Sequence, residues 1–382
     1  MKKILFVSHS AELNGAELWL LETLKRLDRR SYGPSLIVPR PGPLLNAAAD
    51  LGLETHVVPM KWWITERSRI WRQPFGWIWN LKSVKRIASI IHDRSIDLVF
   101  TNSAAMNTGA KAARRTRIPH VWAIHEVLRG PSPFLHYLFG DRALTRTIVK
   151  SSARVIVNSE ITRAAFPGAA NVILIHNGVD VQAGDEGRQN SIRRELGIAA
   201  DDLVAGIVGK IYEGKGQREA IRAVAALSRK YPNLKLLVVG EVRDDAYYEG
   251  LRKIVRENGL DGRVLFVGYH PDLVNVLKVM RVLIVASVVE SFGRAALDGM
   301  SAGVPVLAVR AGGLPEIIQH GRNGFLIDSR EPKEIALALD HLFQNPNEAR
   351  RAVEGGWTTV REKFSIARQI EGIERVLGEI LK

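Results

Sequence analysis

The sequence predicts an α/β protein made of two Rossmann-like, doubly wound domains. Short apolar runs of strand length alternate along the chain with longer segments of helical period, and this alternation starts a second time after a polar stretch at 182–190. A length of 382 residues is sufficient for two domains with a core each. With 46% hydrophobic and 25% charged residues, the composition is that of a globular protein and excludes a disordered or fibrous chain.

The first series begins with a buried strand at 4–7, followed by a helix on which Leu20, Leu24 and Leu27 share one face. Helical stretches separate most of the strands that follow, and strands joined by helices form parallel sheets. The strands expected in this domain are 4–7, 36–38, 97–100, 120–124, 154–157 and 172–175.

The second series follows the polar stretch, which is the expected domain boundary. Its expected strands are 203–208, 234–239, 264–267, 282–286, 304–309 and 325–327, with a helix over 216–230. In the tail, a single apolar stripe of helical spacing is formed by Ile366, Ile370, Ile373, Leu377 and Ile380. The expected limits are therefore 1–180 for the first domain, 181–357 for the second and 358–382 for a helical tail.

Several classes of protein are excluded or disfavoured by what the chain lacks. Without cysteine it has neither disulfides nor a thiolate metal site, which fits a reducing cytoplasm. The longest apolar runs are far shorter than the roughly eighteen residues that span a bilayer, so no transmembrane helix is expected. The apolar run near the N-terminus stops at Ser8, which is too early for a signal peptide.

The net charge of +14 is concentrated in the first half of the chain. Residues 1–180 contain 25 Lys and Arg against 13 Asp and Glu, whereas residues 181–382 contain 29 against 27. Such asymmetry indicates an anionic partner for the first domain. The anionic partner can be nucleic acid, an anionic membrane surface or a phosphorylated substrate.

The second domain has a set of residues that suits a phosphate-bearing ligand. Ligands of doubly wound sheets bind outside the carboxyl ends of the strands, so a cleft between the two domains is expected. Glycines allow close approach to phosphate, helix N-termini attract it, and Lys210 and Lys215 would neutralise a diphosphate without metal. Residues 209–215 match the start of a P-loop, but Gly216 replaces its Ser or Thr, which disfavours a nucleoside triphosphatase. The alternative is an ordinary lysine-bearing surface turn.

Two acidic residues, Glu290 and Asp298, lie across a strand-to-helix turn where both can face one ligand. A carboxylate is a good bidentate acceptor for paired sugar hydroxyls. Two solvated surface acids are the alternative interpretation.

The segment 290–306 resembles the Glu-x7-Glu signature of family 4 retaining glycosyltransferases. Other landmarks of that family occur in order: Asn14-Gly15-Ala16-Glu17 is similar to its N-terminal glycine loop, His125-Glu126 to its His-Asp pair, Asn177-Gly178-Val179-Asp180 to its interdomain motif, Gly209-Lys210 with Lys215-Gly216 to its Gly-Arg and Lys-Gly, and Gly312-Gly313-Leu314-Pro315-Glu316 to its late glycine loop. The resemblance spans nearly the whole chain.

The resemblance implies a GT-B architecture, in which two Rossmann-like domains face a cleft and a C-terminal helix crosses back to the first domain. It places the acceptor side in 1–180 and the nucleotide-sugar site in 181–357. The implied catalytic residues are His125 and Glu290, and the implied donor-binding residues are Gly15, Lys210, Lys215, Glu290, Ser291, Phe292, Gly293 and Asp298. No metal or cofactor is implied beyond the nucleotide-sugar co-substrate.

The implied roles are specific. Glu290 grips the donor sugar, Asp298 the ribose, and the two lysines the diphosphate, while the amides near Phe292 contact sugar or phosphate. His125 contacts the sugar beside the reacting carbon, its alternative being a hydrogen-bonded histidine at a strand end. The Asn-Gly-Val-Asp turn is interpreted as structural.

The expected activity is hexosyl transfer with retention, from a UDP- or GDP-linked sugar to a lipid-linked or glycan acceptor, in surface polysaccharide or glycolipid biosynthesis. The chain departs from the family pattern at three positions, where Asp298 replaces a Glu, Lys210 an Arg and Asn14 a Gly. Lysine gives a point-charge contact where arginine gives a fork. A catalytically reduced GT-B subunit that binds glycan or a partner protein therefore stays open as the alternative.

Five of the eight tryptophans lie within residues 62–79, interleaved with basic residues. Indoles prefer membrane interfaces and cations prefer anionic headgroups, so this segment predicts a peripheral enzyme on the inner, cytoplasmic face of the cell membrane. The expected docking residues are Trp62, Trp63, Arg67, Arg69, Trp71, Arg72, Trp77 and Trp79, with a second patch at Phe134, Leu135, Tyr137, Leu138 and Phe139. Packing under a long loop is one alternative. Single-stranded nucleic acid is another, and the donor-site residues argue against it.

Overall fold

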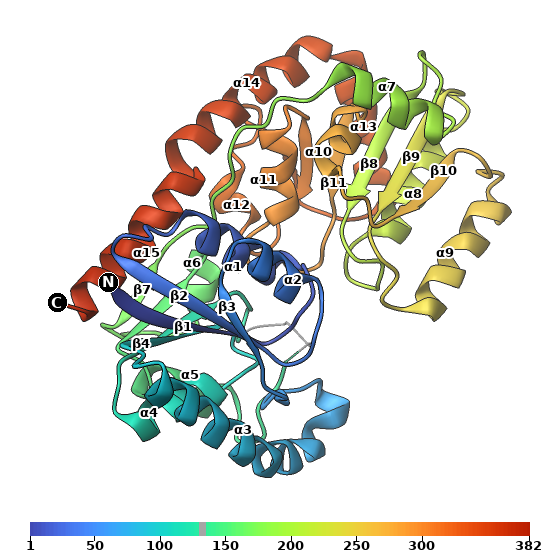
Figure 1. Ribbon diagram of the computed structural model, residues 1–382. Helices are drawn as coiled ribbons and strands as arrows, with labels where there is room; N and C mark the ends of the chain where they lie inside the picture. The colour runs from blue at the N-terminus through green and yellow to red at the C-terminus, as the bar shows by residue number, and fades with distance from the viewer. Residues whose placement is uncertain (130–134) are drawn as a thin grey trace. The chain divides into compact units, whose positions relative to one another are not determined.

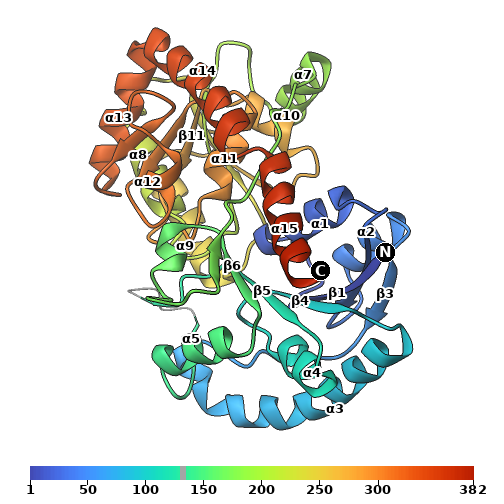
Figure 2. The same cartoon turned by 90° about the vertical axis from the view of Figure 1, so that its left-hand side faces the viewer.

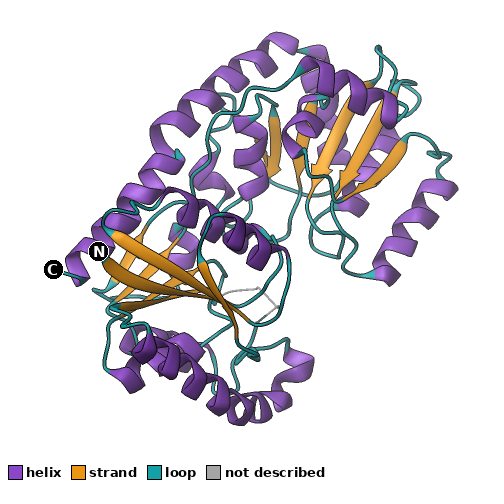
Figure 3. Cartoon of the chain, in the orientation of Figure 1, coloured by secondary structure: helices purple, strands orange, loops and turns teal. Residues whose placement is uncertain are grey.

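The computed structural model describes residues 1–129 and 135–382, and each of its two units is built on a parallel β-sheet (Figures 1 and 3). The first unit comprises Met1–Gly178 together with Ile366–Lys382, and the second comprises Val179–Ser365. The α/β class and the two parallel sheets agree with the expectation from sequence.

The sheet of the first unit has the strand order β3-β2-β1-β4-β5-β6-β7, and every pairing is parallel. Its strands are β1 (Lys2–Ser8), β2 (Tyr32–Val38), β3 (Glu54–Val57), β4 (Leu98–Asn102), β5 (His120–Ile124), β6 (Arg154–Val157) and β7 (Val172–Leu174). The sequence did not predict β3. This edge strand is short and partly exposed, so it lacks the apolar run that marks the others.

Helices cover both faces of this sheet. They are α1 (Gly15–Arg26), α2 (Pro43–Asp50), the 3-10 helix η1 (Arg67–Arg72), α3 (Gln73–Asp93), α4 (Thr108–Thr116), α5 (Asp141–Lys150), α6 (Glu160–Arg163) and α15 (Ile366–Ile380). In β1, Ile4 and Phe6 pack on the side of α1, α2 and α15, whereas Leu5 and Val7 pack on the side of α3 and α4 (Figure 1). Burial on both faces explains why the strands read as continuous apolar runs.

The tail helix α15 packs on the first unit through the stripe expected from sequence. Ile373 and Leu377 are fully buried in one core cluster with residues of α1, and Figure 2 shows the two helices side by side. The buried Gln369 accepts a hydrogen bond from the Gly178 amide (2.7 Å) and donates one to Thr23 Oγ1 (3.1 Å). The Gly178 amide in the turn at 177–180 is thus held by α15, through a side chain that also bonds to α1.

The second sheet has the order β10-β9-β8-β11-β12-β13, again with parallel pairings, which is the strand order of a Rossmann fold. Its strands are β8 (Leu203–Val208), β9 (Leu234–Val239), β10 (Val264–Gly268), β11 (Val282–Val285), β12 (Val306–Val309) and β13 (Phe325–Ile327). These bounds differ from the expected ones by at most two residues at an end.

The helices of the second unit are α7 (Glu186–Glu195), α8 (Gln217–Leu227), α9 (Asp245–Glu257), α10 (Leu273–Lys278), α11 (Arg294–Ser301), α12 (Leu314–Ile317), α13 (Pro332–Gln344) and α14 (Pro346–Lys363). The polar stretch at 182–190, expected to be a domain boundary, contains the start of α7. Ile192 is the one buried residue of this helix, so the helix lacks the apolar stripe by which a helix is recognised in a sequence. Helix α14 continues beyond 357, and the unit ends at Ser365. Among the described helices, none combines the length and the apolar character that crossing a bilayer requires.

Candidate functional site

Three neighbouring strands of the second sheet, β8, β11 and β12, end in the loops that the motifs predict. Lys210 follows β8, Glu290 follows β11, and Gly312 follows β12. Because these strands are parallel and adjacent, their carboxyl ends lie along one edge of the sheet. The fold therefore gathers these loops at the edge where doubly wound sheets bind ligands.

An ion pair joins two of the predicted donor-binding residues. Lys215 Nζ lies 2.5 Å from Glu290 Oε1, and the buried Ser287 donates its hydroxyl hydrogen to the same oxygen at 2.7 Å. Burial disfavours the charged form of Lys215, but the Glu290 carboxylate outweighs it, so the pKa of Lys215 is raised above its usual value. Lys215 is thus held as a cation at the end of β11.

Glycines let these loops approach one another more closely than other residues permit. Gly312 has φ +56°, and a Cβ placed on it would lie 1.9 Å from the Glu290 carbonyl oxygen. The Gly313 amide donates a hydrogen bond to that same oxygen at 2.9 Å. Gly216 has φ +88°, and its Cβ would lie 2.4 Å from the Ala286 carbonyl oxygen. The late glycine loop and the start of α8 are therefore fitted against the backbone around Glu290.

Two helices begin beside this ion pair without a capping side chain. Gly216 precedes α8 and Gly293 precedes α11, both with left-handed backbone. First-turn amides left without a capping side chain suit phosphate oxygens. Phe292 is buried and its ring lies 5.8 Å from that of Phe364, so only its backbone is suited to a ligand. Ser291 beside it is half-buried.

The two other residues of the second unit that are predicted to bind the donor differ in their partners. Asp298 accepts a hydrogen bond from Arg294 Nε at 2.7 Å within α11, so its carboxylate is paired in this structure. Lys210 is half-buried, and its carbonyl accepts from Gln217 Nε2 at 3.0 Å. Within the described ranges, no carboxylate lies within ion-pair distance of the Lys210 ammonium.

In the first unit, His125 follows β5 and is oriented by the residue at the end of β4. Its Nε2 lies 2.7 Å from Asn102 Oδ1, and Asn102 Nδ2 donates to the Ala16 carbonyl at 3.0 Å. Because the Asn102 oxygen accepts, Nε2 of His125 carries the hydrogen and Nδ1 carries the lone pair. The ring also makes an edge contact with Trp19, at 4.9 Å between centroids.

The backbone around His125 is fixed by Glu126. One oxygen of its carboxylate accepts from the amides of His125 (3.1 Å) and Ala104 (3.0 Å), and the other accepts from the Ser103 hydroxyl. Ser103 has φ +89°, a left-handed conformation that is costly for a residue with a Cβ. Glu126, the acidic residue of the His125-Glu126 pair, thus joins the loop after β4 to the loop after β5.

The N-terminal loop continues this polar cluster. His9 Nδ1 lies 3.1 Å from Oε1 of the fully buried Glu17, whose other oxygen accepts from the Asn14 amide at 3.2 Å. Gly15 is exposed at the first position of α1. Burial lowers the pKa of His125 to about 4; Glu126 acts against this shift and His9 adds to it. His125 is therefore uncharged at neutral pH.

The tryptophan-rich segment divides into an exposed part and a buried part. Trp71 and Trp79 are exposed, as are Arg67, Arg69 and Arg72, and Trp62 is 41% exposed. The prediction for Trp63 and Trp77 was wrong. Trp63 is 1% exposed and donates to the Ala104 carbonyl at 2.6 Å, and Trp77 is half-buried and donates to the Trp63 carbonyl at 3.2 Å.

The second aromatic patch is also divided. Phe134 lies outside the described residues. Leu135 and Tyr137 pack on the core around Trp63, whereas Leu138 and Phe139 are exposed. Phe139 stacks on Trp77, with 5.8 Å between centroids. Packing under the loop, the alternative considered above, therefore holds for the inner part of both patches.

Sequence reasoning missed the residues that orient the predicted ones. Asn102 is the last residue of β4 and Ser287 lies two residues after β11, and a polar residue at the end of an apolar strand was the available signal. Glu17 was part of a quoted motif, but its burial beside His9 depends on the fold. In the described part of the chain, no cluster of three or more His, Asp or Glu is arranged to hold a metal ion.

Two family models match this chain. The model described as Glycosyltransferase Family 4 matches residues 13–183, and that described as Glycosyl transferases group 1 matches residues 188–357. The D-inositol 3-phosphate glycosyltransferase of Corynebacterium kroppenstedtii is 30% identical over 63% of this chain and 56% of its own length. That of Mycobacterium bovis is 31% identical over 56% and 45%. The chain thus spans about half the length of the curated relatives it matches.

Solved structures share the fold of this chain. HepE of Anabaena, crystallised with UDP and glucose, is 24% identical, with a TM-score of 0.83 over 99% of this chain and 100% of that one. A glycosyltransferase of Rickettsia africae is 20% identical, with a TM-score of 0.84 over 100% and 99%. The GT-B fold expected from the motifs is therefore confirmed.

Replacing Gly312 with alanine should destabilise the protein more than the same change at Gly321. Both glycines have positive φ, +56° and +75°, but a Cβ at Gly321 meets no atom within 4 Å. Gly321→Ala should lower the free energy of unfolding by about 1–2 kcal/mol, the cost of left-handed backbone. Gly312→Ala adds the collision with the Glu290 carbonyl oxygen. Equal losses in denaturant unfolding of the two variants would contradict the packing described for the glycine loop.

The His125 ring should stay uncharged as the pH falls through the usual histidine range. Its pKa is about 4 in the folded protein and 6.5 in a model peptide. The unfolded chain therefore binds the proton first, and His125's contribution to stability is complete above pH 6.5 and is lost as the pH falls toward 4. An NMR titration of the ring, assigned with His125→Gln, measures this directly. A midpoint near 6.5 would show that the ring is not buried as described.

Proposed function

The chain belongs to glycosyltransferase family 4, and from this premise we propose that it is a hexosyltransferase. It transfers the hexose from a nucleotide diphosphate sugar to a lipid-linked or glycan acceptor. The configuration at the anomeric carbon is retained. The observation that carries the proposal is the cationic, glycine-lined edge of the second sheet. There Lys215 is paired with Glu290 between two helix N-termini. Such an edge suits a diphosphate and a sugar at once.

Lys215, Lys210 and the first amides of α8 and α11 stabilise the leaving nucleotide diphosphate as the glycosidic bond breaks. Charge that develops on this group meets donors that are already in place, which is the largest electrostatic contribution available to such a site. Glu290 accepts hydrogen bonds from donor sugar hydroxyls while it remains paired with Lys215. Asp298 accepts from the ribose after exchanging its bond with Arg294.

His125 acts as a neutral imidazole. Asn102 holds its Nε2 hydrogen, so Nδ1 accepts a hydrogen bond from a hydroxyl of the reacting sugar. An uncharged ring adds no repulsion as the sugar gains positive character in the transition state. Glu126 is the residue that keeps this loop in place.

Transfer in this proposal needs no metal ion, because two lysines and two helix N-termini supply the positive charge. UDP is the first nucleotide to test, since HepE was crystallised with UDP and with UDP-glucose. The proposed biological setting is assembly of a surface polysaccharide or a glycolipid at the inner face of the cell membrane.

Thermal unfolding with UDP, GDP, ADP and dTDP, each with and without EDTA, tests the donor site. One nucleotide should raise the midpoint equally in both conditions, because a ligand at about 100 times its Kd adds about 2.7 kcal/mol to the stability of the native state. Lys215→Met should remove most of this rise. Lys253→Met, at an exposed lysine of α9, is the matched control.

A rise that disappears with EDTA would contradict metal independence. No rise with any nucleotide would favour the alternative of a catalytically reduced subunit. If a donor binds, replacing Glu290 with Ala should abolish transfer of the labelled sugar, and unchanged turnover would refute the role assigned to Glu290.

Membrane association is part of the same proposal. The surface proposed to contact the membrane is one face of η1 and α3. Trp71, Phe75 and Ile78 are 60%, 68% and 68% exposed, and Lys82 and Lys85 continue the same face at helical spacing. The opposite face of α3, which includes Val84, Ile87 and Ile91, packs in the core. An exposed apolar surface with basic residues beside it is complementary to an anionic bilayer.

Co-sedimentation with phosphatidylcholine vesicles containing phosphatidylglycerol tests this surface. Binding should weaken in Ile78→Ser and in Lys82→Ser, the first through lost apolar contact and the second by about 1 kcal/mol of headgroup attraction. Leu337→Ser, at an exposed leucine of α13 in the other unit, should bind as the wild type does. Added salt should weaken binding. Binding to single-stranded oligonucleotides in place of vesicles would overturn the membrane assignment.

A further inference from the structure

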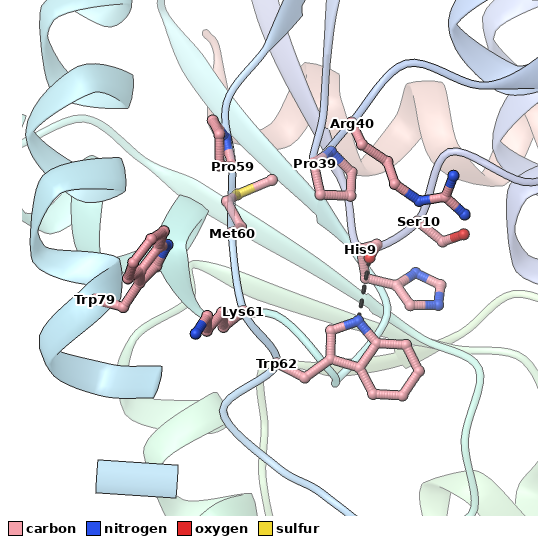
Figure 4. A pocket seen from close by; sticks show the side chains of 9 residues that line it. All are labelled: His9, Ser10, Pro39, Arg40, Pro59, Met60, Lys61, Trp62 and Trp79. Carbon is pink, nitrogen blue, oxygen red and sulfur yellow. Dashed lines mark hydrogen bonds between the residues drawn. The ribbon is translucent and has the colours of Figure 1, made fainter. Parts of the chain in front are cut away.

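A hollow of about 390 Å³ lies in the first unit, and its lining includes Lys61 and Arg40, to which no role is assigned above (Figure 4). It is formed by the loops after β1, β2 and β3, together with Trp79 of α3. These three strands are neighbours in the sheet, so the hollow lies at their carboxyl ends.

The segment that forms one wall is pinned before any ligand arrives. The buried Asn80 of α3 accepts from the Lys61 amide at 2.9 Å and donates to the Lys61 carbonyl at 2.7 Å. Trp62 Nε1 donates to the His9 carbonyl at 3.2 Å, and the His9 and Trp62 rings lie 5.6 Å apart. A wall fixed in this way loses little conformational freedom when a ligand binds.

The hollow combines cations with aromatic faces. Lys61 Nζ lies 4.5 Å from the centre of the Trp79 ring and, among the described residues, has no carboxylate within ion-pair distance. Arg40 on the other side is paired with Glu12 at the surface. Figure 4 shows Lys61 between Trp62 and Trp79, with Arg40 and His9 on the opposite side from Trp79. Cations suit phosphate oxygens, and an exposed indole suits the apolar face of a sugar ring.

The hollow is also connected to the catalytic histidine. His9 lines it, and its Nδ1 lies 3.1 Å from Glu17 of α1. The carbonyl of Ala16, in the same helix, accepts from Asn102, which holds the His125 ring. A ligand in the hollow would therefore lie beside the edge of the sheet that carries His125.

We propose that this hollow binds the phosphate group of a phosphorylated sugar acceptor, with Lys61 and Arg40 holding the phosphate and Trp62 packing on the sugar. This inference rests on the proposed function, because it names the acceptor class of the same transfer. Trp79 belongs both to the hollow and to the exposed surface of α3, so a soluble sugar phosphate and a lipid-linked one meet the same residues. The shared chemistry is a phosphate ester of a sugar or a polyprenol.

Calorimetric titration with glucose 1-phosphate, in the presence of saturating UDP to fill the donor site, tests the inference. Lys61→Met should weaken binding about tenfold, the loss expected for one charge-assisted hydrogen bond. Trp62→Ala should weaken it as well, and glucose without phosphate should bind much less. Lys150→Met, at an exposed lysine of α5, is the matched control. Equal affinity of the Lys61 and Lys150 variants would overturn the assignment.

Vesicles of phosphatidylcholine with and without polyprenyl phosphate distinguish the two sources of the phosphate. If Lys61→Met reduces binding to the polyprenyl phosphate vesicles, the acceptor is lipid-linked. If it reduces binding of glucose 1-phosphate alone, the acceptor is soluble. If it changes neither, the hollow is not a phosphate site.

The thermal shift with UDP separates this inference from the proposed function. If Lys61→Met retains the UDP shift and binds glucose 1-phosphate as the wild type does, the phosphate site in the hollow is contradicted and the proposed transferase activity is not. If no nucleotide raises the unfolding midpoint of the wild type but glucose 1-phosphate binding still depends on Lys61, the proposed transferase activity is contradicted. The hollow then remains a phosphate site.

Discussion

The burial of both faces of each parallel sheet is the constraint on which the rest of this protein depends. Strands such as β1 and β11 have no solvated face on which to display polar groups, so polar side chains concentrate in the loops after the strands. Parallel pairing then brings those loops to one edge. The Lys215–Glu290 pair in one sheet and the His125–Asn102 pair in the other are both results of this arrangement.

Most of the charged side chains at these edges have a partner within the protein. Lys215 is paired with Glu290 and Asp298 with Arg294, while His125 stays neutral because burial opposes its protonation. Removing one partner of a buried pair leaves an uncompensated charge and is strongly destabilising, whereas a bound anion adds a new partner. A diphosphate bound as proposed would therefore find cations that the protein already holds in position. The bond between Asp298 and Arg294, which the proposal requires to be exchanged, is a local one within α11.

The sequence predicted the sheets better than it predicted which aromatic residues are exposed. Strand positions follow from local apolar runs, and only the partly exposed edge strand β3 escaped notice. Exposure of an indole depends on tertiary partners that no local pattern contains. Trp63 is buried because it stacks near Trp122 of β5, with 6.0 Å between centroids, and this contact is distant in sequence. The same reasoning explains why Asn102 and Ser287 were missed, since their importance lies in the neighbour that each one contacts.

Two of the three departures from the family motif, Asp298 and Lys210, fall on residues that the proposal assigns to the donor, and they leave the supporting structure intact. Among the described residues, the Asp298 carboxylate is bonded within its own helix, and the Lys210 ammonium has no carboxylate within ion-pair distance. Gly312 and Gly313 still fit against the 290–292 backbone, and Ser287 still orients Glu290. A Cβ on Gly312 would collide with the Glu290 carbonyl oxygen in any folded chain, so the packing of this loop is a requirement of the fold itself. The changes at Asp298 and Lys210 therefore alter side chains that the proposal assigns to the donor, and they leave the backbone around Glu290 as the fold requires it.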